Sequence, residues 1–232
     1  MKTTDFDHDL TAWLSAWRVW LLAAFIGAGL AAAVYFLFPP AYRARATATV
    51  DHNLEQALPQ GSDRDLFYYL QRETDKLATV AWADATLEQV AAQVPGMTVQ
   101  ALRGGTLSLS QPKDGAWHFW AESNDPAQAR SLAAAWAEAF VSQVRSGMDT
   151  AARIEAAQTL LANSASADES AALVAQIAEL QTRSMGISPY LQVSLSQDVG
   201  LPVERAVGLG SYLFAGSALA ALLAFLYLVF KK

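Results

Sequence analysis

The sequence contains no cysteine, which excludes disulfide bonds, thiolate metal sites and a cysteine nucleophile. Charge is also scarce: 16% of residues are charged and the net charge is −6, which argues against a nucleic-acid partner. The three histidines, His8, His52 and His118, lack metal-ligand spacing to one another or to carboxylates. No Gly-x-Ser-x-Gly motif or glycine-rich phosphate loop occurs. We therefore expect no catalytic residues, no metal and no cofactor.

Hydrophobic residues are abundant, at 53%, and they concentrate in two uncharged blocks. Residues 19–38 (VWLLAAFIGAGLAAAVYFLF) form the first block and residues 206–230 the second. A helix of about 20 residues spans roughly 30 Å, the thickness of a bilayer core, so both blocks are predicted transmembrane helices. The alternatives for the first block are a cleaved signal peptide and a buried helix of a soluble protein. The block is long for the apolar region of a signal peptide, and it has no Ala-x-Ala site followed by a polar start.

Two spans place both termini on one side of a membrane and the middle of the chain on the other. We expect residues 1–18 to be a cytoplasmic amphipathic segment, residues 39–205 an extracytoplasmic domain, and residues 231–232 a cytoplasmic end. Positive charges are nearly balanced between the two sides, so this orientation depends on the small size of the terminal tails. The expected location is the bacterial inner membrane, with the central domain periplasmic or extracellular.

Both spans carry small residues four positions apart, notably Gly27 with Ala31 and Gly216 with Ala220. Such spacing lets two membrane helices approach closely, so these four residues are candidates for span packing. Gly29 with Ala33 shows the same spacing. The alternative is that glycine and alanine are simply common in spans.

The central segment predicts an α+β domain. Residues 43–50 alternate between small apolar and polar side chains, which favours a strand. Residues 51–65 read as a loop, and residues 65–94 as helix with a break near 78–81. Residues 106–110 and 116–123 predict a hairpin across a Pro-Lys-Asp-Gly turn, and residues 190–197 predict a last strand. The first and last strands each adjoin a span, so we expect them to neighbour one another in one small, mainly antiparallel sheet with helices on one face.

Residues 126–185 predict a helical arm. Asp125 followed by Pro126 is a typical helix start, and the alanine-rich sequence after it extends toward residue 161. Ser166-x-x-Glu169 matches a capping box and predicts the start of a second helix, ending near Gly186. Together they predict an antiparallel pair that stands away from the membrane.

Candidate contact residues lie on the predicted strands. Arg43 and Arg45 share one strand face close to the first span, where they are candidates to bind lipid phosphates or a pyrophosphate-linked intermediate; the alternative is simple solvation. Trp120 is a candidate to stack on a sugar ring, whereas Trp117 and Phe119 point to the other side and are expected in the core. The carboxylate pairs Asp63/Asp65 and Glu73/Asp75 are expected to be solvated.

Three segments resemble the polysaccharide copolymerases, the chain-length determinant (Wzz) family. They are PPAYRARATATV (residues 39–50), SNDPAQARSLAAAWAEAF (residues 123–140) and SPYLQVSLSQDVGLP (residues 188–202). The first resembles the strand that follows the family's first span. The second resembles its Asp-Pro helix start, and the third its return strand.

The resemblance implies a non-enzymatic, homo-oligomeric regulator of polysaccharide chain length in envelope glycan biosynthesis, covering O-antigen (lipopolysaccharide), capsule or exopolysaccharide. Its implied partners are further copies of the chain through lateral contacts, a membrane polysaccharide polymerase, the lipid bilayer and the polysaccharide itself. Two alternatives remain: a membrane adaptor for an exporter or kinase, and a sensor or accessory subunit of another membrane complex.

Overall fold

The computed structural model describes residues 17–110, 115–164, 166–196 and 203–230 of the 232-residue chain. The chain divides into two compact units, Met1–Ala41 with Arg205–Lys232, and Tyr42–Glu204. Most of the predicted amphipathic segment 1–18, the hairpin turn at 111–114 and the terminal residues 231–232 lie outside the described residues.

The first unit consists of two apolar helices, α2 (Trp17–Leu37) and α9 (Leu209–Phe230). Both are long and apolar enough to cross a membrane. Helix α9 begins three residues later than the predicted block, after a bend at Ala206 and Val207. The Arg205 Nη1 donates to the Pro40 carbonyl at 2.7 Å, and the Ala206 N–H donates to the Ala41 carbonyl at 2.8 Å.

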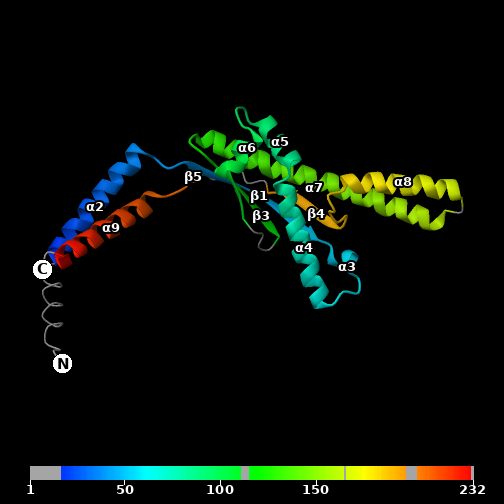
Figure 1. Ribbon diagram of the computed structural model, residues 1–232, viewed down its shortest axis with the longest axis horizontal. Coiled ribbons are helices and arrows are strands. Elements are labelled where there is room, and N and C mark those ends of the chain that lie inside the picture. Colours follow the sequence, from blue (N-terminus) through cyan, green and yellow to red (C-terminus); the bar gives the residue numbers. More distant parts are fainter. Residues whose placement is uncertain (1–16, 111–114, 165, 197–202, 231–232) are drawn as a thin grey trace, which may run out of the picture. The chain divides into compact units, whose positions relative to one another are not determined.

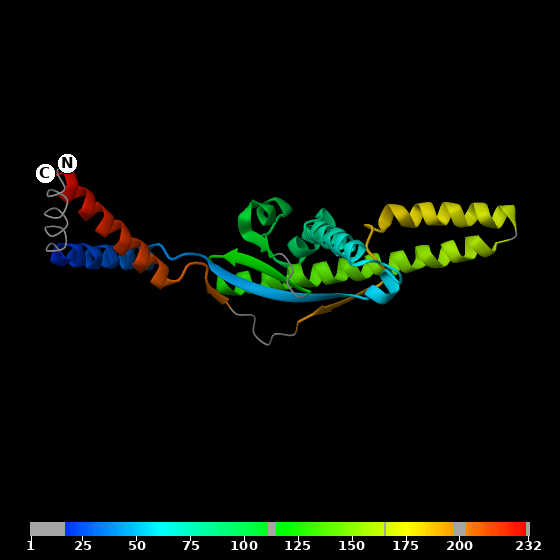
Figure 2. The same ribbon diagram turned by 90° about the horizontal axis from the view of Figure 1, so that it is seen from below.

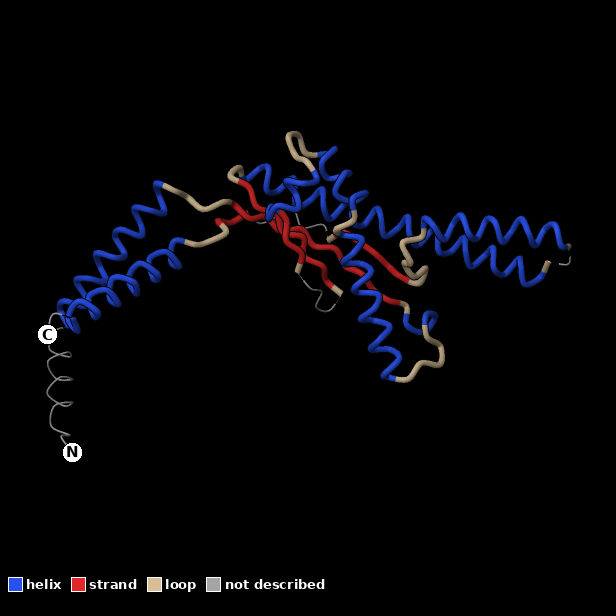
Figure 3. Tube along the Cα trace, viewed as in Figure 1, coloured by secondary structure: helices blue, strands red, loops and turns tan. Residues whose placement is uncertain are grey.

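The second unit contains a five-stranded sheet, shown red in Figure 3. Its strands are β1 (Tyr42–His52), β2 (Leu107–Leu109), β3 (Ala116–Ser123), β4 (Leu191–Leu195) and β5 (Val203–Arg205). The order is β2-β3-β1-β4, with β5 also paired to β1, and the pairs β1/β3, β1/β4 and β2/β3 are antiparallel. The predicted antiparallel sheet with neighbouring first and last strands is confirmed, although β5 was not predicted.

Strand β1 alternates as expected from its sequence. Its inward side chains, Ala44, Ala46, Ala48 and Val50, are at most 3% exposed. Because three of them are alanines, the long helix α7 (Pro126–Asn163) can lie directly against the middle of the sheet, where it contacts β1, β3 and β4.

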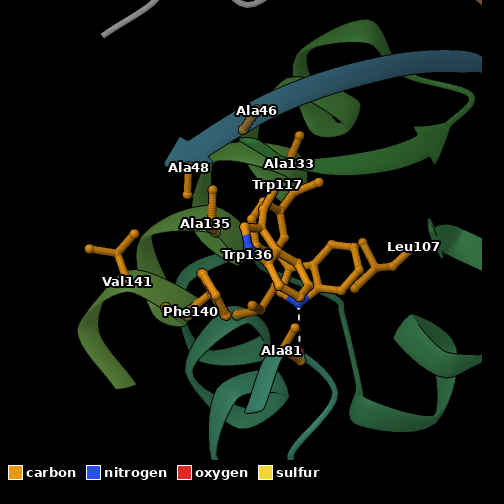
Figure 4. Packing of buried hydrophobic residues seen from close by; sticks show 14 of the residues in the cluster. Ala46, Ala48, Ala81, Leu107, Trp117, Ala133, Ala135, Trp136, Phe140 and Val141 are labelled. Atoms are coloured by element: carbon orange, nitrogen blue, oxygen red, sulfur yellow. Dashed lines mark hydrogen bonds between the residues drawn. The ribbon is translucent and has the colours of Figure 1, made fainter. Parts of the chain in front are cut away.

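Helix α7 begins as predicted, with the Asp125 side chain accepting from the Ala127 N–H at 2.9 Å and Pro126 in the first turn. In its first half buried side chains cover most of the helix, because α4 and α5 contact it as well as the sheet. A narrow stripe through Ser131, Glu138, Ser142 and Arg145 stays exposed. Trp136 and Phe140 are fully buried here and contact Phe119 of β3 with ring centroids 5.0 Å apart. Figure 4 shows the indole of Trp136 donating to the Ala81 carbonyl, at 2.8 Å.

The predicted arm is correct in type but too long. Only the second half of α7 pairs with α8 (Ala167–Arg183), and the two helices run side by side past the end of the sheet (Figures 1 and 2). Residues 129–144 of the predicted arm belong to the core instead. The capping-box prediction is wrong as well: Ser166 is the N-cap, but its side chain makes no capping hydrogen bond. The Ser170 hydroxyl donates to the Ser166 carbonyl instead, at 2.9 Å.

The segment between β1 and β2 is more helical than predicted. It contains α3 (Leu54–Ala57), α4 (Asp63–Ala81), α5 (Asp84–Gln93), α6 (Val99–Ala101) and a π-helical turn (Leu102–Thr106). The break between α4 and α5 falls at residues 82–83, close to its predicted place. The loop predicted over 51–65 is wrong in part: the Asn53 side chain caps α3, and Ser62 and Asp65 form a reciprocal capping box at α4.

Candidate functional sites

The four candidate residues for span packing come together where α2 meets α9. A Cβ placed on Gly27 would lie 2.5 Å from the Ala220 Cβ, and one placed on Gly216 would lie 2.5 Å from the Ala31 Cβ. Glycine is therefore required at both positions for the two backbones to approach this closely. We name Gly27, Ala31, Gly216 and Ala220 the span seam. Gly29 takes no part, since a Cβ there would meet nothing within 4 Å.

Aromatic contacts lie at both ends of this helix pair. Trp20 contacts Phe225 with ring centroids 5.7 Å apart, and Tyr35 contacts Tyr212 at 5.2 Å. The two contacts show that α2 and α9 run antiparallel over most of their lengths.

The second candidate site is the outer face of the sheet, which is the face opposite α7. It is formed by the outward side chains of β1, by their neighbours on β3, and by Ser194 of β4, namely Arg43, Arg45, Thr47, Thr49, His118, Trp120, Glu122 and Ser194. The antiparallel register sets Arg43 opposite Glu122, Arg45 opposite Trp120 and Thr47 opposite His118. Directly opposed side chains are close enough to interact, so the register alone makes this face a row of polar pairs.

The three residues predicted to contact lipid or glycan meet in the middle of this row. The guanidinium carbons of Arg43 and Arg45 lie 5.7 Å and 5.5 Å from the centroid of the Trp120 ring, within cation–π range. Arg43 also forms an ion pair with Glu122, with its Nε donating at 2.7 Å. Trp120 thus contacts both guanidinium groups of this face.

The two arginines differ in their charge balance. Glu122 neutralises Arg43, whereas no acidic side chain pairs with Arg45 among the described residues. The Arg45 Nε is buried and finds no hydrogen-bond acceptor in the described part of the chain. Arg45 is therefore a guanidinium that contacts an aromatic ring and forms no ion pair among the described residues.

Neutral hydrogen-bonding groups continue the row. The Thr47 hydroxyl lies 3.0 Å from His118 Nδ1, and the Thr49 hydroxyl lies 2.9 Å from that of Ser194. Burial lowers the pKa of His118, and repulsion by Arg45 lowers it further, so this imidazole is neutral at pH 7.

A third polar cluster lies where α4 meets the base of the arm. The Glu73 side chain is only 3% exposed, and its Oε1 accepts from Lys76 Nζ at 2.7 Å. Lys76 Nζ also donates to the Gly186 carbonyl just after α8, at 2.7 Å. The expectation that Glu73 is solvated is therefore wrong, because packing of the segment after α8 covers this side of α4. Asp63, Asp65 and Asp75 are exposed as expected.

Two further pairs of side chains belong to this cluster: His52 with Tyr69, and Tyr190 with Glu155. His52 at the end of β1 contacts the Tyr69 ring with centroids 6.1 Å apart, and burial lowers the pKa of His52, only partly offset by the carboxylates of Glu73 and Asp51. The Tyr190 hydroxyl donates to Glu155 of α7 at 2.5 Å, which raises the pKa of Tyr190. The cluster was not predicted, since its members are far apart in the sequence and their pattern carries no signal.

The described residues contain no group of three or more His, Cys, Asp or Glu side chains arranged to hold a metal ion. No protein-family model matches the sequence, and no curated protein is significantly similar to it.

Proposed function

We propose that this chain is a non-enzymatic regulator of polysaccharide chain length, acting as a homo-oligomer beside a membrane polymerase during envelope glycan biosynthesis. In this proposal α2 and α9 cross the bacterial inner membrane, both termini are cytoplasmic, and the unit Tyr42–Glu204 works outside the membrane. The proposal draws on the resemblance of three segments to the chain-length determinant family and on the geometry of the two units.

The observation that carries the proposal is that the first and last strands of the second unit pair with each other. Strand β1 follows α2 directly, strand β5 precedes α9, and the two strands pair. The span seam then brings α2 and α9 together along their lengths. The chain therefore enters and leaves the second unit through neighbouring strands, which suits a domain carried by two paired spans.

Exposed apolar side chains on the second unit support lateral assembly. Phe67 and Tyr68 on α4 are 65% and 55% exposed, and Leu160 and Val174 on the arm are 60% and 54% exposed. Large apolar groups on an otherwise polar surface are typical of protein–protein contacts when they face a partner. Heterologous contacts that repeat around an axis close into a ring.

The test in cells is deletion of the gene, followed by sizing of surface glycans on a gel. We expect deletion to broaden or shift the modal chain length, and the wild-type gene to restore it. An unchanged distribution, accompanied by failed assembly of another membrane complex, would replace this proposal with the accessory-subunit alternative.

The test in solution is the mass of the detergent-extracted particle, measured with and without changes on the arm. We expect a homo-oligomer that dissociates when Leu160→Glu and Val174→Glu are combined. The matched control combines Gln158→Glu and Gln176→Glu, which add the same charges at exposed polar positions of the same helices. A wild-type monomer would count decisively against the proposal.

A further inference from the structure

We propose that the outer face of the sheet binds a carboxylate-bearing sugar of the polysaccharide, with the Arg45 guanidinium as the anion-binding group. This inference rests on the proposed function, and it adds the chemical class of glycan that the protein recognises. It assigns Trp120 the role of positioning Arg45.

The first argument is the charge of Arg45 itself. Two nitrogens of Arg43 donate to Oε1 of Glu122, and the nearest carboxylate in the row forms no ion pair with Arg45. Trp120 restricts the Arg45 side chain, which reduces the entropy lost on binding. A planar guanidinium matches a carboxylate through two parallel hydrogen bonds, so a fixed and unneutralised arginine is well suited to this ligand.

The second argument is the chemistry that surrounds Arg45. Thr47, Thr49 and Ser194 offer hydroxyl groups on the same face, and the neutral imidazole of His118 can both donate and accept. Each sugar unit of a polysaccharide carries hydroxyl groups that donate and accept hydrogen bonds. The neutral polar side chains of this face can therefore form hydrogen bonds with several consecutive sugar units. The face therefore combines one cationic group for a carboxylate with a row of neutral side chains that can form hydrogen bonds with sugar hydroxyls.

A phospholipid surface fits this face less well. Recognition of anionic lipid typically uses clusters of about 4–8 Lys or Arg residues. Here one of two arginines is neutralised, and Asp51 adds an exposed negative charge at the far end of β1. An isolated positive charge beside hydroxyl groups favours an acidic glycan over a membrane.

The test is binding of hexagalacturonate to the full-length chain in nanodiscs of zwitterionic lipid, measured by calorimetry. Fully methyl-esterified hexagalacturonate is the matched neutral probe. We expect the acidic probe to bind more tightly and its affinity to fall as salt increases. Arg45→Gln should weaken binding of the acidic probe about tenfold or more, and Arg45→Lys should weaken it less. Arg183→Gln, at an exposed arginine of α8, should have no effect.

Circular dichroism and thermal unfolding of each variant exclude a folding defect, and Arg45→Lys keeps the charge if Arg45→Gln does not fold. Equal affinity for the two probes, or unchanged binding by both Arg45 variants, would overturn the inference. If only nanodiscs of anionic lipid respond to Arg45→Gln, the site binds lipid and the inference is wrong.

This test separates the inference from the proposed function. Arg45-dependent binding together with an unchanged glycan length after gene deletion would retain the site and reject the chain-length role. A changed glycan length with no preference for the acidic probe would retain the chain-length role and reject the carboxylate site.

Discussion

Loss of the Lys76 ammonium should destabilise the second unit far more than loss of an ordinary surface charge. Lys76→Met leaves the Glu73 carboxylate, 3% exposed, without its cation, and it also removes a hydrogen bond to the Gly186 carbonyl. Breaking a buried ion pair from one side costs about 3–5 kcal/mol. We expect about 3 kcal/mol, the lower end, because 32% of the Lys76 side chain remains exposed.

The assay is urea unfolding of the full chain in detergent, followed by tryptophan fluorescence. The matched control is Arg183→Met, which removes the cation of an exposed pair with Glu179 on α8, where we expect a cost below about 0.5 kcal/mol. Adding Glu73→Leu to Lys76→Met should recover at least about 1 kcal/mol, since no unpaired charge is then buried. Equal costs for Lys76→Met and Arg183→Met would refute the reasoning.

Three further predictions concern the core, the span seam and pH. Trp136→Phe should cost about 2–4 kcal/mol in urea unfolding, because it leaves the buried Ala81 carbonyl unpaired and opens a cavity; a cost below about 1 kcal/mol would show that neither loss matters. Gly27→Ile should lower the thermal midpoint of the chain in detergent, whereas Gly29→Ile should not, and similar midpoints would contradict the seam. His52 has a pKa lowered from 6.5 by burial, so the unfolded chain takes up the proton first and stability falls as pH drops below 6.5. His52→Gln should therefore reduce the stability lost between about pH 7.5 and about pH 5.5, and an unchanged loss would assign it to other groups.

The sequence predicted those elements whose signal is local. Two long uncharged blocks predicted α2 and α9, period-two alternation predicted β1, and Asp125 with Pro126 predicted the start of α7. Each depends on the spacing of side chains along one element, which is readable without knowing what packs against it.

The length of the arm could not be predicted from the local spacing of side chains. Alanine occurs throughout the first half of α7, and an alanine-rich helix shows little difference between its faces. Trp136, Phe140 and Val144 lie among these alanines four positions apart, and large apolar residues at that spacing are typical of a helix face packed in a core. That pattern was a usable signal for burial of residues 129–144, and the prediction of a helical arm over residues 126–185 did not use it.

The candidate sites depended on register and tertiary packing. Spacing four identified Gly27 and Gly29 equally, and only the rotation of α2 against α9 selects Gly27. Alternation placed Arg43 and Arg45 on one face, but the offset of β3 decides that Glu122 pairs with Arg43 and Trp120 with Arg45. A shift of β3 by two residues in one direction would set Glu122 opposite Arg45 instead of Arg43.

Strand β1 therefore links the stability of the second unit to its candidate ligand site. The inward alanines allow α7 to approach closely, and α7 holds Phe119 of β3 between Trp136 and Phe140. Phe119 is the chain neighbour of both His118 and Trp120, so core packing fixes the position from which these two side chains reach the outer face. Arg45 is held in turn by Trp120 on the other side of the sheet. The geometry of the proposed carboxylate site thus depends on a core that the ligand never touches, because successive residues of one strand point to opposite faces.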